Sequence, residues 1–218
     1  MSELLPLTLD ELLTTTRSVR KRLDLDRPVP RDVIEECVRI AMQSPSGANR
    51  QAWQWVFVAD PAKKRALAEI YRKQFDVSYR VMPVATHDDP KLQAQAIRRR
   101  ESATWLADNF ERVPLMMIPC QAGRVDSASV GEQAGFWGSL LPAVWNFMLA
   151  LRARGLGSAW VTMNLSRPEG ERETAEVVGI PYERYTQAGL FPVGYTVGSD
   201  FKPVAVRDVS EVVHWDRW

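Results

Sequence analysis

The chain contains 218 residues, of which 45% are hydrophobic and 25% are charged, so its length and composition fit a single folded globular domain. Its formal net charge of +1 at pH 7 provides no overall field that would hold it on nucleic acid or on an anionic membrane. The longest clearly apolar stretch, residues 140–151, contains Asn146 and is too short to span a bilayer.

Local patterns in the first third of the chain predict helices and one strong strand. The run Thr8-Leu-Asp-Glu11 is a capping box, and Pro30 suits the first turn of a second helix. The run Trp53-Gln-Trp-Val-Phe-Val58 is rich in aromatic and β-branched residues, as a buried strand is. The predicted elements are therefore a helix at 9–15, a helix from 30 to the loop at 44–47, a strand at 53–58 and a helix from 60 to about 74.

The remaining two thirds predict a longer alternation of helices and strands. The elements are a loop or lid at 76–90, a charged helix at 91–112, a strand at 113–119, a long helix at 132–154, a strand at 158–163, a helix at 168–178 and a strand at 187–197. Prolines bound the strand at 113–119, where an edge or a strand end tolerates them. Gly155-Leu-Gly157 ends the long helix.

No repeat or linker interrupts this pattern, so we predict one α+β domain over residues 1–218, with a lid or insertion at about 76–112 and an extended C-terminal tail at about 198–218. The helix at 132–154 is apolar nearly all round, which predicts that it is buried centrally or against a partner chain. The tail should pack on its own body or on another subunit, because it carries large apolar side chains. These are Val206, Val209, Val212, Val213, Trp215 and Trp218.

Several classes of enzyme site lack their residues in this sequence. The histidines are His87 and His214, no Gly-x-Ser-x-Gly elbow is present, and neither Cys37 nor Cys120 has a partner that would activate a thiol. The same residues form no metal-ligand spacing, so no metal site is expected. The N-terminus does not read as a signal peptide, and a cytoplasmic location is expected.

A basic run at residues 17–22 is the first candidate site. Arg17 and Arg20 are three residues apart with Ser18 between them, so two guanidinium groups and a hydroxyl could converge on a phosphate. The plainer alternative is a solvated charged loop. An arm that binds nucleic acid is less favoured, because no stacking aromatic residues interleave the arginines.

The loop Ser44-Pro-Ser-Gly-Ala-Asn-Arg-Gln51 is the second candidate site. As a connector, it would use Gly47 and Asn49 for backbone freedom. As a polar cradle, it would let the main chain approach a flat ring while Asn49 and Gln51 offer amide groups to heteroatoms on the ring edge.

Taken together, the two segments resemble the nitroreductase family of FMN-dependent flavoproteins. The run at 17–20 precedes a Val-Pro-x-x-x-Ile-Glu helix, and the Pro-Ser-Gly-x-Asn-x-Gln loop at 45–51 leads into a tryptophan-rich strand. The stretches 141–160, 193–195 and 202–207 then match the family in order. The resemblance implies a three-layer α+β sandwich, a mostly antiparallel sheet flanked by helices, in an intertwined homodimer with two FMN sites at its interface.

The resemblance also implies a role for particular residues. Arg17, Ser18 and Arg20 would bind the FMN phosphate and ribityl chain, with Arg207 joining from the tail, and whether Lys202 also contacts the phosphate is left open. The residues expected along the isoalloxazine ring, often across the dimer interface, are Pro45, Ser46, Asn49 and Gln51, and those expected near N5 are Trp160, Val161 and Thr162.

Two positions depart from the family pattern. Thr16 stands where the family often has an arginine, which leaves the phosphate one cation short unless Lys21, Arg22 or Arg207 compensates. Ala52 replaces a common proline, which should matter little.

The activity implied is a ping-pong cycle in which NAD(P)H reduces the flavin and the flavin then reduces an electron-poor small molecule, such as a nitroaromatic or a quinone. No catalytic side chain is named, because the cofactor carries the chemistry. The alternatives are a family-related reductive dehalogenase or flavin-destructase-like activity, a flavin-storage protein without turnover, and a nucleic-acid-binding module that uses residues 17–22.

Overall fold

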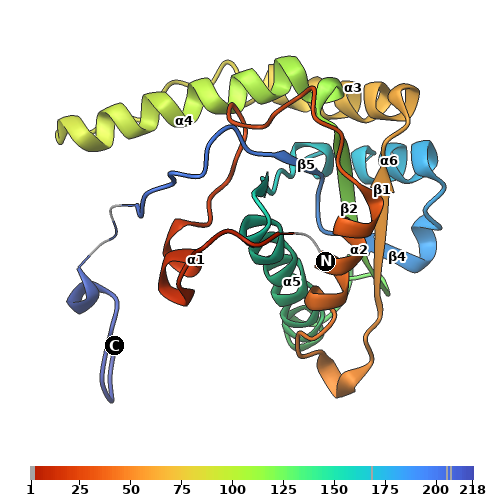
Figure 1. Ribbon diagram of the computed structural model, residues 1–218. Helices are drawn as coiled ribbons and strands as arrows, with labels where there is room; N and C mark the ends of the chain where they lie inside the picture. The colour runs from red at the N-terminus through yellow and green to blue at the C-terminus, as the bar shows by residue number, and fades with distance from the viewer. Residues whose placement is uncertain (1–2, 168, 205, 207) are drawn as a thin grey trace.

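Within residues 3–167, 169–204, 206 and 208–218, which the computed structural model describes, five strands form one sheet of antiparallel ladders (Figure 1). The strands are β1 (Trp53–Val58), β2 (Leu115–Ala122), β3 (Leu156–Ser158), β4 (Tyr185–Gln187) and β5 (Phe191–Tyr195). Their order is β1-β2-β5-β3, and β4 pairs with β2 beside β5. The predicted α+β class with a mostly antiparallel sheet is confirmed.

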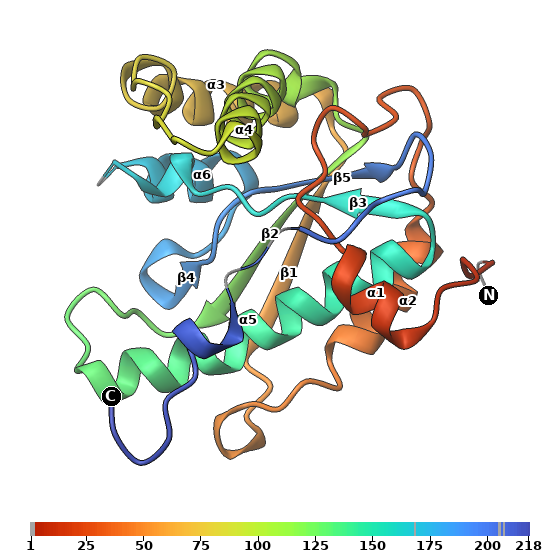
Figure 2. The same ribbon diagram turned by 90° about the vertical axis from the view of Figure 1, so that its left-hand side faces the viewer.

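Helices cover both faces of this sheet, as Figure 2 shows. They are α1 (Leu9–Thr15), α2 (Arg31–Ala41), α3 (Pro61–Val77), α4 (Pro90–Asn109), α5 (Val130–Ala153) and α6 (Gly170–Val178). Short 3-10 turns lie at Gly47–Asn49, Phe110–Arg112, Met163–Leu165, Tyr182–Arg184 and Val209–Glu211. Alternate residues of β2 face the two layers: Met116 and Ile118 pack towards α3 and α4, whereas Leu115 and Met117 pack towards α2 and α5. The three-layer arrangement is therefore confirmed.

Helix α5 is the central helix of one layer. A capping box of Ser129 and Glu132 starts it, and its buried residues include Leu140, Phe147 and Leu151. Among the described residues it is also the one helix that is long and apolar enough to cross a membrane, contrary to the expectation from its shorter apolar stretch. The helix packs against α2, β2 and β3, so its hydrophobic residues serve as core residues of the domain.

The strand predicted at 158–163 is wrong beyond its first residue, and the strand predicted at 187–197 is two strands. Strand β3 ends at Ser158, and Val161 makes only an isolated bridge with Leu190. Strands β4 and β5 are separated because residues 159–161 cross the chain at Gly189, where the backbone has φ +135°. A Cβ atom at Gly189 would lie 2.6 Å from the Val161 carbonyl oxygen, so the two backbones could not approach this closely with a larger residue.

The proline at position 119 lies inside β2 and not at a strand end as predicted. Its carbonyl accepts a hydrogen bond of 2.9 Å from the Ala188 N–H, at the gap between the β5 pairs, which end at Met117, and the β4 pairs, which start at Cys120. The main-chain nitrogen of an antiparallel residue points to the same side as its carbonyl, so the missing N–H of Pro119 faces this gap. A central strand tolerates the proline because no ladder bond is required there.

The start of the C-terminal tail packs on the body of the chain, where Phe201 lies against the core, but its last part, residues 208–218, does not. Figure 1 shows this last part leading away from the sheet, with Trp215 83% and Trp218 100% exposed. The expectation that the tail packs on its own body therefore holds for its first residues and is wrong for residues 208–218. On the same side of the molecule in Figure 1, above the tail, the N-terminal half of α4 also extends beyond the sheet, while Leu106 and Ala107 in its other half are fully buried in the core.

Candidate functional site

The N-terminal basic segment, residues 16–24, runs along the edge of the sheet next to β3. The Val19 N–H donates to the Ser158 carbonyl at 2.8 Å, and the Asp24 N–H donates to the main chain of β5 at 2.8 Å. Gly157 permits the approach, because a Cβ atom there would lie 2.7 Å from a methyl carbon of Val19. The segment is thereby held in an extended form that places Arg17 and Ser18 beside the end of β3.

The two arginines of this segment have different surroundings. The Arg17 Nη1 group donates to the Lys202 carbonyl at 3.0 Å. Arg20 lies instead near Tyr71 and Tyr79, and burial lowers the pKa of its guanidinium group. Ser18 is exposed next to Arg17. In this structure Arg17 thus lies against the main chain of Lys202, while Arg20 is directed towards α3 and the turn after it.

The C-terminal strap, which we define as residues 197–202, is fastened to the basic segment by arginines. Three of them donate to its main-chain carbonyls: Arg22 to Val197 at 2.9 Å, Arg152 to Ser199 at 2.9 Å and Arg17 to Lys202 at 3.0 Å. The Phe201 ring lies 4.1 Å from the Arg22 guanidinium carbon and 4.9 Å from that of Arg152. The strap therefore brings the main chain of Lys202 to the side chain of Arg17.

The residues expected to compensate for Thr16 are mostly engaged elsewhere. Lys21 and Arg22 each face an acidic side chain: Glu101 at 3.4 Å from Lys21 and Asp200 at 2.6 Å from Arg22. Arg207 lies outside the described residues. The cation that the structure adds here is Arg152, at the end of α5, which sequence patterns did not single out because it sits in an apolar helix far along the chain.

Buried polar atoms without partners gather around this edge. Of the nine such side-chain atoms in the described part of the chain, four belong to Arg20 (Nε), Arg152 (Nε and Nη1) and Ser158 (Oγ). Buried polar groups are almost always hydrogen-bonded, so each of these calls for an acceptor that the chain itself does not supply. A phosphate and a polyol chain present many acceptor oxygens, and the donors present here fit such a group.

The segment Trp160 to Thr162 continues from the same edge. The Trp160 indole N–H donates to the Ala188 carbonyl at 2.6 Å, and its ring lies nearly parallel to Phe191 with centroids 6.2 Å apart. Val161 is tied to Leu190 by two main-chain hydrogen bonds of 3.1 and 2.8 Å. These contacts fix the segment close to Ser158 and leave Thr162 exposed.

The loop at 44–51 is held by the other layer. The Gly47 N–H donates to the Ser139 hydroxyl at 2.9 Å, and the Ser44 hydroxyl accepts from the Asn146 amide at 2.7 Å. The Gln51 amide donates to the Asn49 side chain at 2.9 Å. Three residues have left-handed backbone angles, which are costly away from glycine and are concentrated at functional sites: Ala48 (φ 52°), Asn49 (φ 52°) and Gln51 (φ 48°).

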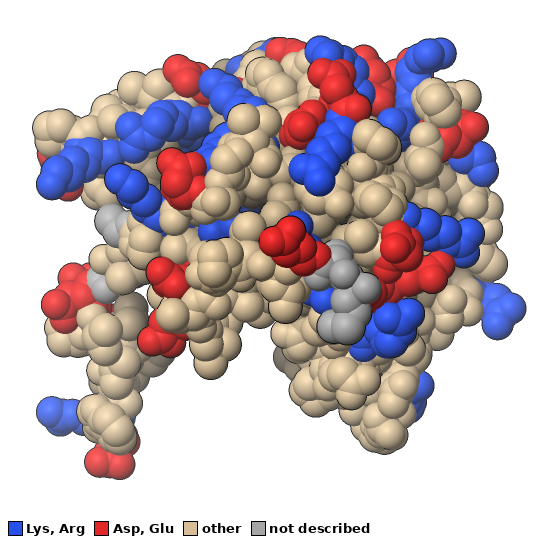
Figure 3. Space-filling view, in the orientation of Figure 1, with Lys and Arg blue, Asp and Glu red and all other residues tan. Residues whose placement is uncertain are grey.

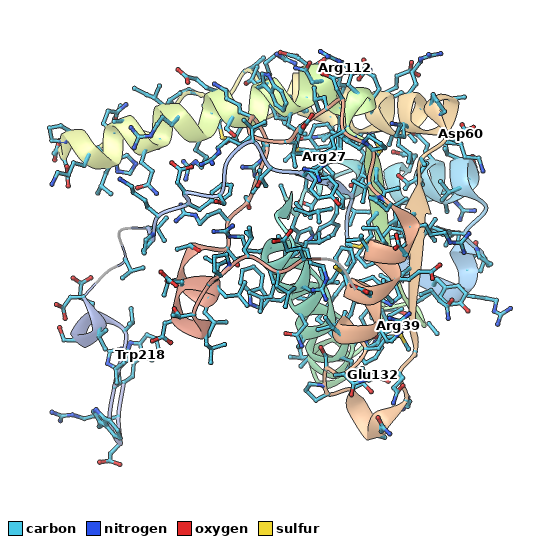
Figure 4. The ribbon with its side chains drawn as sticks, in the orientation of Figure 1. Arg27, Arg39, Asp60, Arg112, Glu132 and Trp218 are labelled. Carbon is cyan, nitrogen blue, oxygen red and sulfur yellow. The ribbon has the colours of Figure 1, made fainter. Side chains whose placement is uncertain are left out.

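A cavity of about 430 Å³ lies beside this loop. It is lined by residues of the loop, of the end of β2 and of the first turns of α5, including Ser46, Gln51, Gln121, Glu132 and Phe136. The Gln121 side chain donates to the Phe136 carbonyl at 3.1 Å, while its own buried oxygen has no partner in the described chain. Figure 4 labels Glu132 at the lower end of α5, next to the loop.

The two groups of predicted residues do not form one site within a single chain. The loop contacts α5 at Ser139, and the end of α1, just before the basic segment, contacts it at Arg152, whose Nη2 lies 3.4 Å from the Thr15 hydroxyl. These α5 positions are 13 residues apart, which corresponds to about 20 Å along the helix axis. The structure thus brings Arg17 and the strap with Lys202 to one end of α5, whereas residues 160–162 are tied to Ala188 and Leu190, between β4 and β5. The loop at 44–51, which contains Pro45, Ser46, Asn49 and Gln51, lies at the other half of α5, as Figure 2 shows.

Neither thiol suits a nucleophile. Burial raises the pKa of Cys37 to about 11 and that of Cys120 to about 12, so both stay protonated at neutral pH.

The described residues contain no group of three potential metal ligands. Figure 3 shows Lys and Arg along α4 with acidic side chains interspersed elsewhere, and the described part of this face has no continuous basic stripe of the kind that nucleic acid prefers.

Comparison with known proteins adds a family to this geometry. Residues 13–195 match the model of the Nitroreductase family. Iodotyrosine deiodinase 1 of Sus scrofa is 26% identical over 175 residues, which cover 74% of this chain and 57% of that protein. The chain spans 24% to 57% of the length of the first iodotyrosine deiodinases that it matches.

Two solved structures have the same fold. One is oxidized iodotyrosine deiodinase bound to FMN and 3-iodo-L-tyrosine, with a TM-score of 0.69 and 23% identity over 97% of this chain and 100% of that chain. The other is an FMN- and NADPH-dependent nitroreductase of Sphigopyxis sp. strain HMH, with a TM-score of 0.69 and 18% identity over the same shares of the two chains.

Proposed function

Because the chain belongs to the nitroreductase family, we propose that it is an FMN-dependent oxidoreductase that uses NAD(P)H to reduce an electron-poor small molecule such as a nitroaromatic or a quinone. The observation that carries the proposal is the set of buried polar atoms without partners on Arg20, Arg152 and Ser158, around the basic segment, which suits a phosphorylated ligand. One structural relative is bound to FMN and the other depends on FMN, which supports the same cofactor here.

When bound, FMN would supply the hydride chemistry of a ping-pong cycle. Arg17, Ser18 and Lys202 would bind its phosphate, with Arg207 completing the group from the tail. Arg20 would donate its free Nε group to the ribityl chain or the adjacent ring edge, since it is directed away from Arg17. The N–H of Val161 is already used by Leu190, so the ring near N5 is assigned to Trp160 and to the exposed hydroxyl of Thr162.

The second half of the site would come from a second copy of the chain. The loop that carries Pro45, Ser46, Asn49 and Gln51 is held about 20 Å along α5 from Arg152, and a homodimer would place this loop of one chain over the flavin bound at the basic segment of the other. Exposed apolar side chains on the layer of α2 and α5, Leu4, Ile40 and Trp145, support a partner surface, and the exposed Trp215 and Trp218 of the projecting tail could contact the same partner. Two equivalent sites per dimer would result.

The segment at 76–112 would form the outer wall of the acceptor pocket. The N-terminal half of α4 projects past the sheet, and Leu92 and Ile97 on it are 42% and 44% exposed. A wall of this kind can move with little cost, because only the other half of α4 is anchored in the core. Its apolar side chains favour a flat, electron-poor organic acceptor.

Reductive dehalogenation is the second candidate activity. The chain is 26% identical to iodotyrosine deiodinase 1 over most of its own length, and the loop at 44–51 is compatible with either acceptor. The two activities share the cofactor site and differ in the bond that is reduced.

One experiment separates these possibilities. Purified protein should show flavin absorption near ~450 nm and release FMN on denaturation, and it should then oxidise NADH or NADPH only when a nitroaromatic, a quinone or an iodophenol is added. The acceptor that is turned over identifies the activity. A colourless protein that ignores added FMN would contradict the proposal, and a colourless protein with salt-dependent affinity for nucleic acid would replace it. Bound FMN without acceptor-dependent turnover would indicate a storage protein.

A further inference from the structure

Arg152 is a buried cation without an acid. Its side chain lies at the C-terminal end of α5, and the residue is only 3% exposed. Its Nη2 group donates to the Ser199 carbonyl at 2.9 Å and reaches the Thr15 hydroxyl at 3.4 Å, while Nε and Nη1 have no acceptor in the described chain. An arginine stays charged in proteins, and a buried charge without a counter-charge is strongly unfavourable.

The surroundings increase this need for an anion. The neighbouring Arg22 adds a second positive charge and, with burial as the larger cause, lowers the pKa of Arg152. Other arginines nearby form ion pairs. Arg22 faces Asp200 at 2.6 Å, and Arg154, two residues after Arg152, faces Glu36 at 3.3 Å. Among the described residues, no ion pair is formed by Arg152.

Its position links Arg152 to the phosphate group of the proposed site. Thr15 is two residues before Arg17, and the strap carbonyls bound by Arg152 and Arg17 belong to Ser199 and Lys202. Arg152 therefore binds the strap at Ser199, and Arg17 binds it three residues further along, at Lys202. Its contact residue Thr15 directly precedes Thr16, the position at which the family pattern has a cation that this chain lacks.

We propose that Arg152 is a positioning residue of the phosphate site, and that its buried charge and its hold on the strap make the chain select FMN over riboflavin. This inference rests on the proposed function. The guanidinium group acts in two ways. Its charge favours the phosphate dianion of FMN beside the basic segment, and its hydrogen bond to Ser199 keeps Lys202 beside Arg17.

Comparing two flavins tests the role directly, because riboflavin and FMN share the ring and the ribityl chain and differ in the phosphate. Apo-protein is titrated with each flavin, and the quenching of flavin fluorescence gives the two dissociation constants. Arg152→Met removes the charge at similar length, Arg152→Lys keeps the charge but loses the planar group, and Arg31→Met is the control, since that arginine side chain is 93% exposed.

We expect Arg152→Met to weaken FMN binding roughly tenfold or more with little effect on riboflavin, so that the preference for FMN falls by about the same factor. Arg152→Lys should keep part of the preference, and Arg31→Met all of it. Equal losses for both flavins, or no loss at all, would overturn the inference. If Arg152→Met does not fold, as judged by circular dichroism, the Arg152→Lys and Arg152→Gln ratios decide in the same way. Wild-type protein that binds neither flavin would instead refute the proposed function.

Discussion

The basic residues near the N-terminus make different contacts although they belong to one run. Lys21 and Arg22 are turned to acidic side chains, Arg17 to a main-chain carbonyl of the strap, and Arg20 to two tyrosines. Spacing alone cannot show this, because the segment follows the sheet edge and then bends at Arg20. The free hydrogen-bonding capacity of each side chain, more than its charge, separates the candidate ligands from the structural ones.

Replacing Arg17 by Ala should weaken FMN binding by roughly 1.5–3 kcal/mol, the magnitude of a hydrogen bond to a charged group. Arg20→Ala should cost a similar amount through the lost Nε donor. Isothermal titration of apo-protein measures both. Lys21→Ala is the matched control, because its side chain is 46% exposed in a surface ion pair and should leave the affinity unchanged. Unchanged FMN affinity in both arginine variants would mean that the phosphate lies elsewhere.

At the scale of elements, the sheet is shaped by the crossing of two segments at one glycine. Residues 159–161 pass so close to Gly189 that β4 stops and β5 starts on its other side, and the Trp160 indole is fastened to Ala188 at the same place. The crossing carries the segment assigned to the flavin ring out of the sheet towards the basic segment. The geometry of the proposed ring site thus depends on a residue that does not itself touch a ligand.

Gly189→Ala should destabilise the protein by about 1–3 kcal/mol, because φ of +135° is unfavourable for alanine and the new methyl group would meet the Val161 carbonyl. Thermal unfolding followed by tryptophan fluorescence measures the loss and also reports a shift of Trp160. Gly138→Ala is the opposite control: it lies in α5 with open space around it, and alanine should stabilise the helix by about 0.5–1 kcal/mol. Equal stability of the two variants would contradict this account of the crossing.

For the whole molecule, the central fact is the separation of the two candidate half-sites along α5. The helix carries Arg152 near one end and Ser139 near the middle. Ser139 holds the loop at 44–51, and Arg152 contacts the strap and Thr15, just before the basic segment. Because a folded helix is rigid on this length scale, these two contacts are held about 20 Å apart. A second chain is the simplest source of the missing half.

Mixed dimers test this arrangement. A chain carrying Arg17→Ala and a chain carrying Asn49→Ala with Gln51→Ala should each bind FMN weakly as homodimers. If each site combines the basic segment of one chain with the loop of the other, co-expression of the two variants should restore one of the two sites in every mixed dimer, as measured by bound flavin per chain. No restoration, with dimers verified by sedimentation, would place each site within a single chain.

Local chemistry in the sequence determined a large part of this protein. The capping box at Thr8 and Glu11 and the tryptophan-rich run at 53–58 gave element bounds that the structure confirms, because caps and strand preferences depend on residues close in the chain. The ordered motifs also identified the family, which the match over residues 13–195 confirms.

Tertiary structure alone decided the rest. It split the predicted strand at 187–197, placed Pro119 within a central strand, parted the loop at 44–51 from the basic segment, and set Arg152 beside Thr15. Each of these features depends on contacts between segments that are distant in the sequence. They result from the close crossing at Gly189, the gap in the ladder at Pro119 and the length of α5. Sequence periodicity carries no such long-range information, since it records which face of an element is buried and not what lies against it.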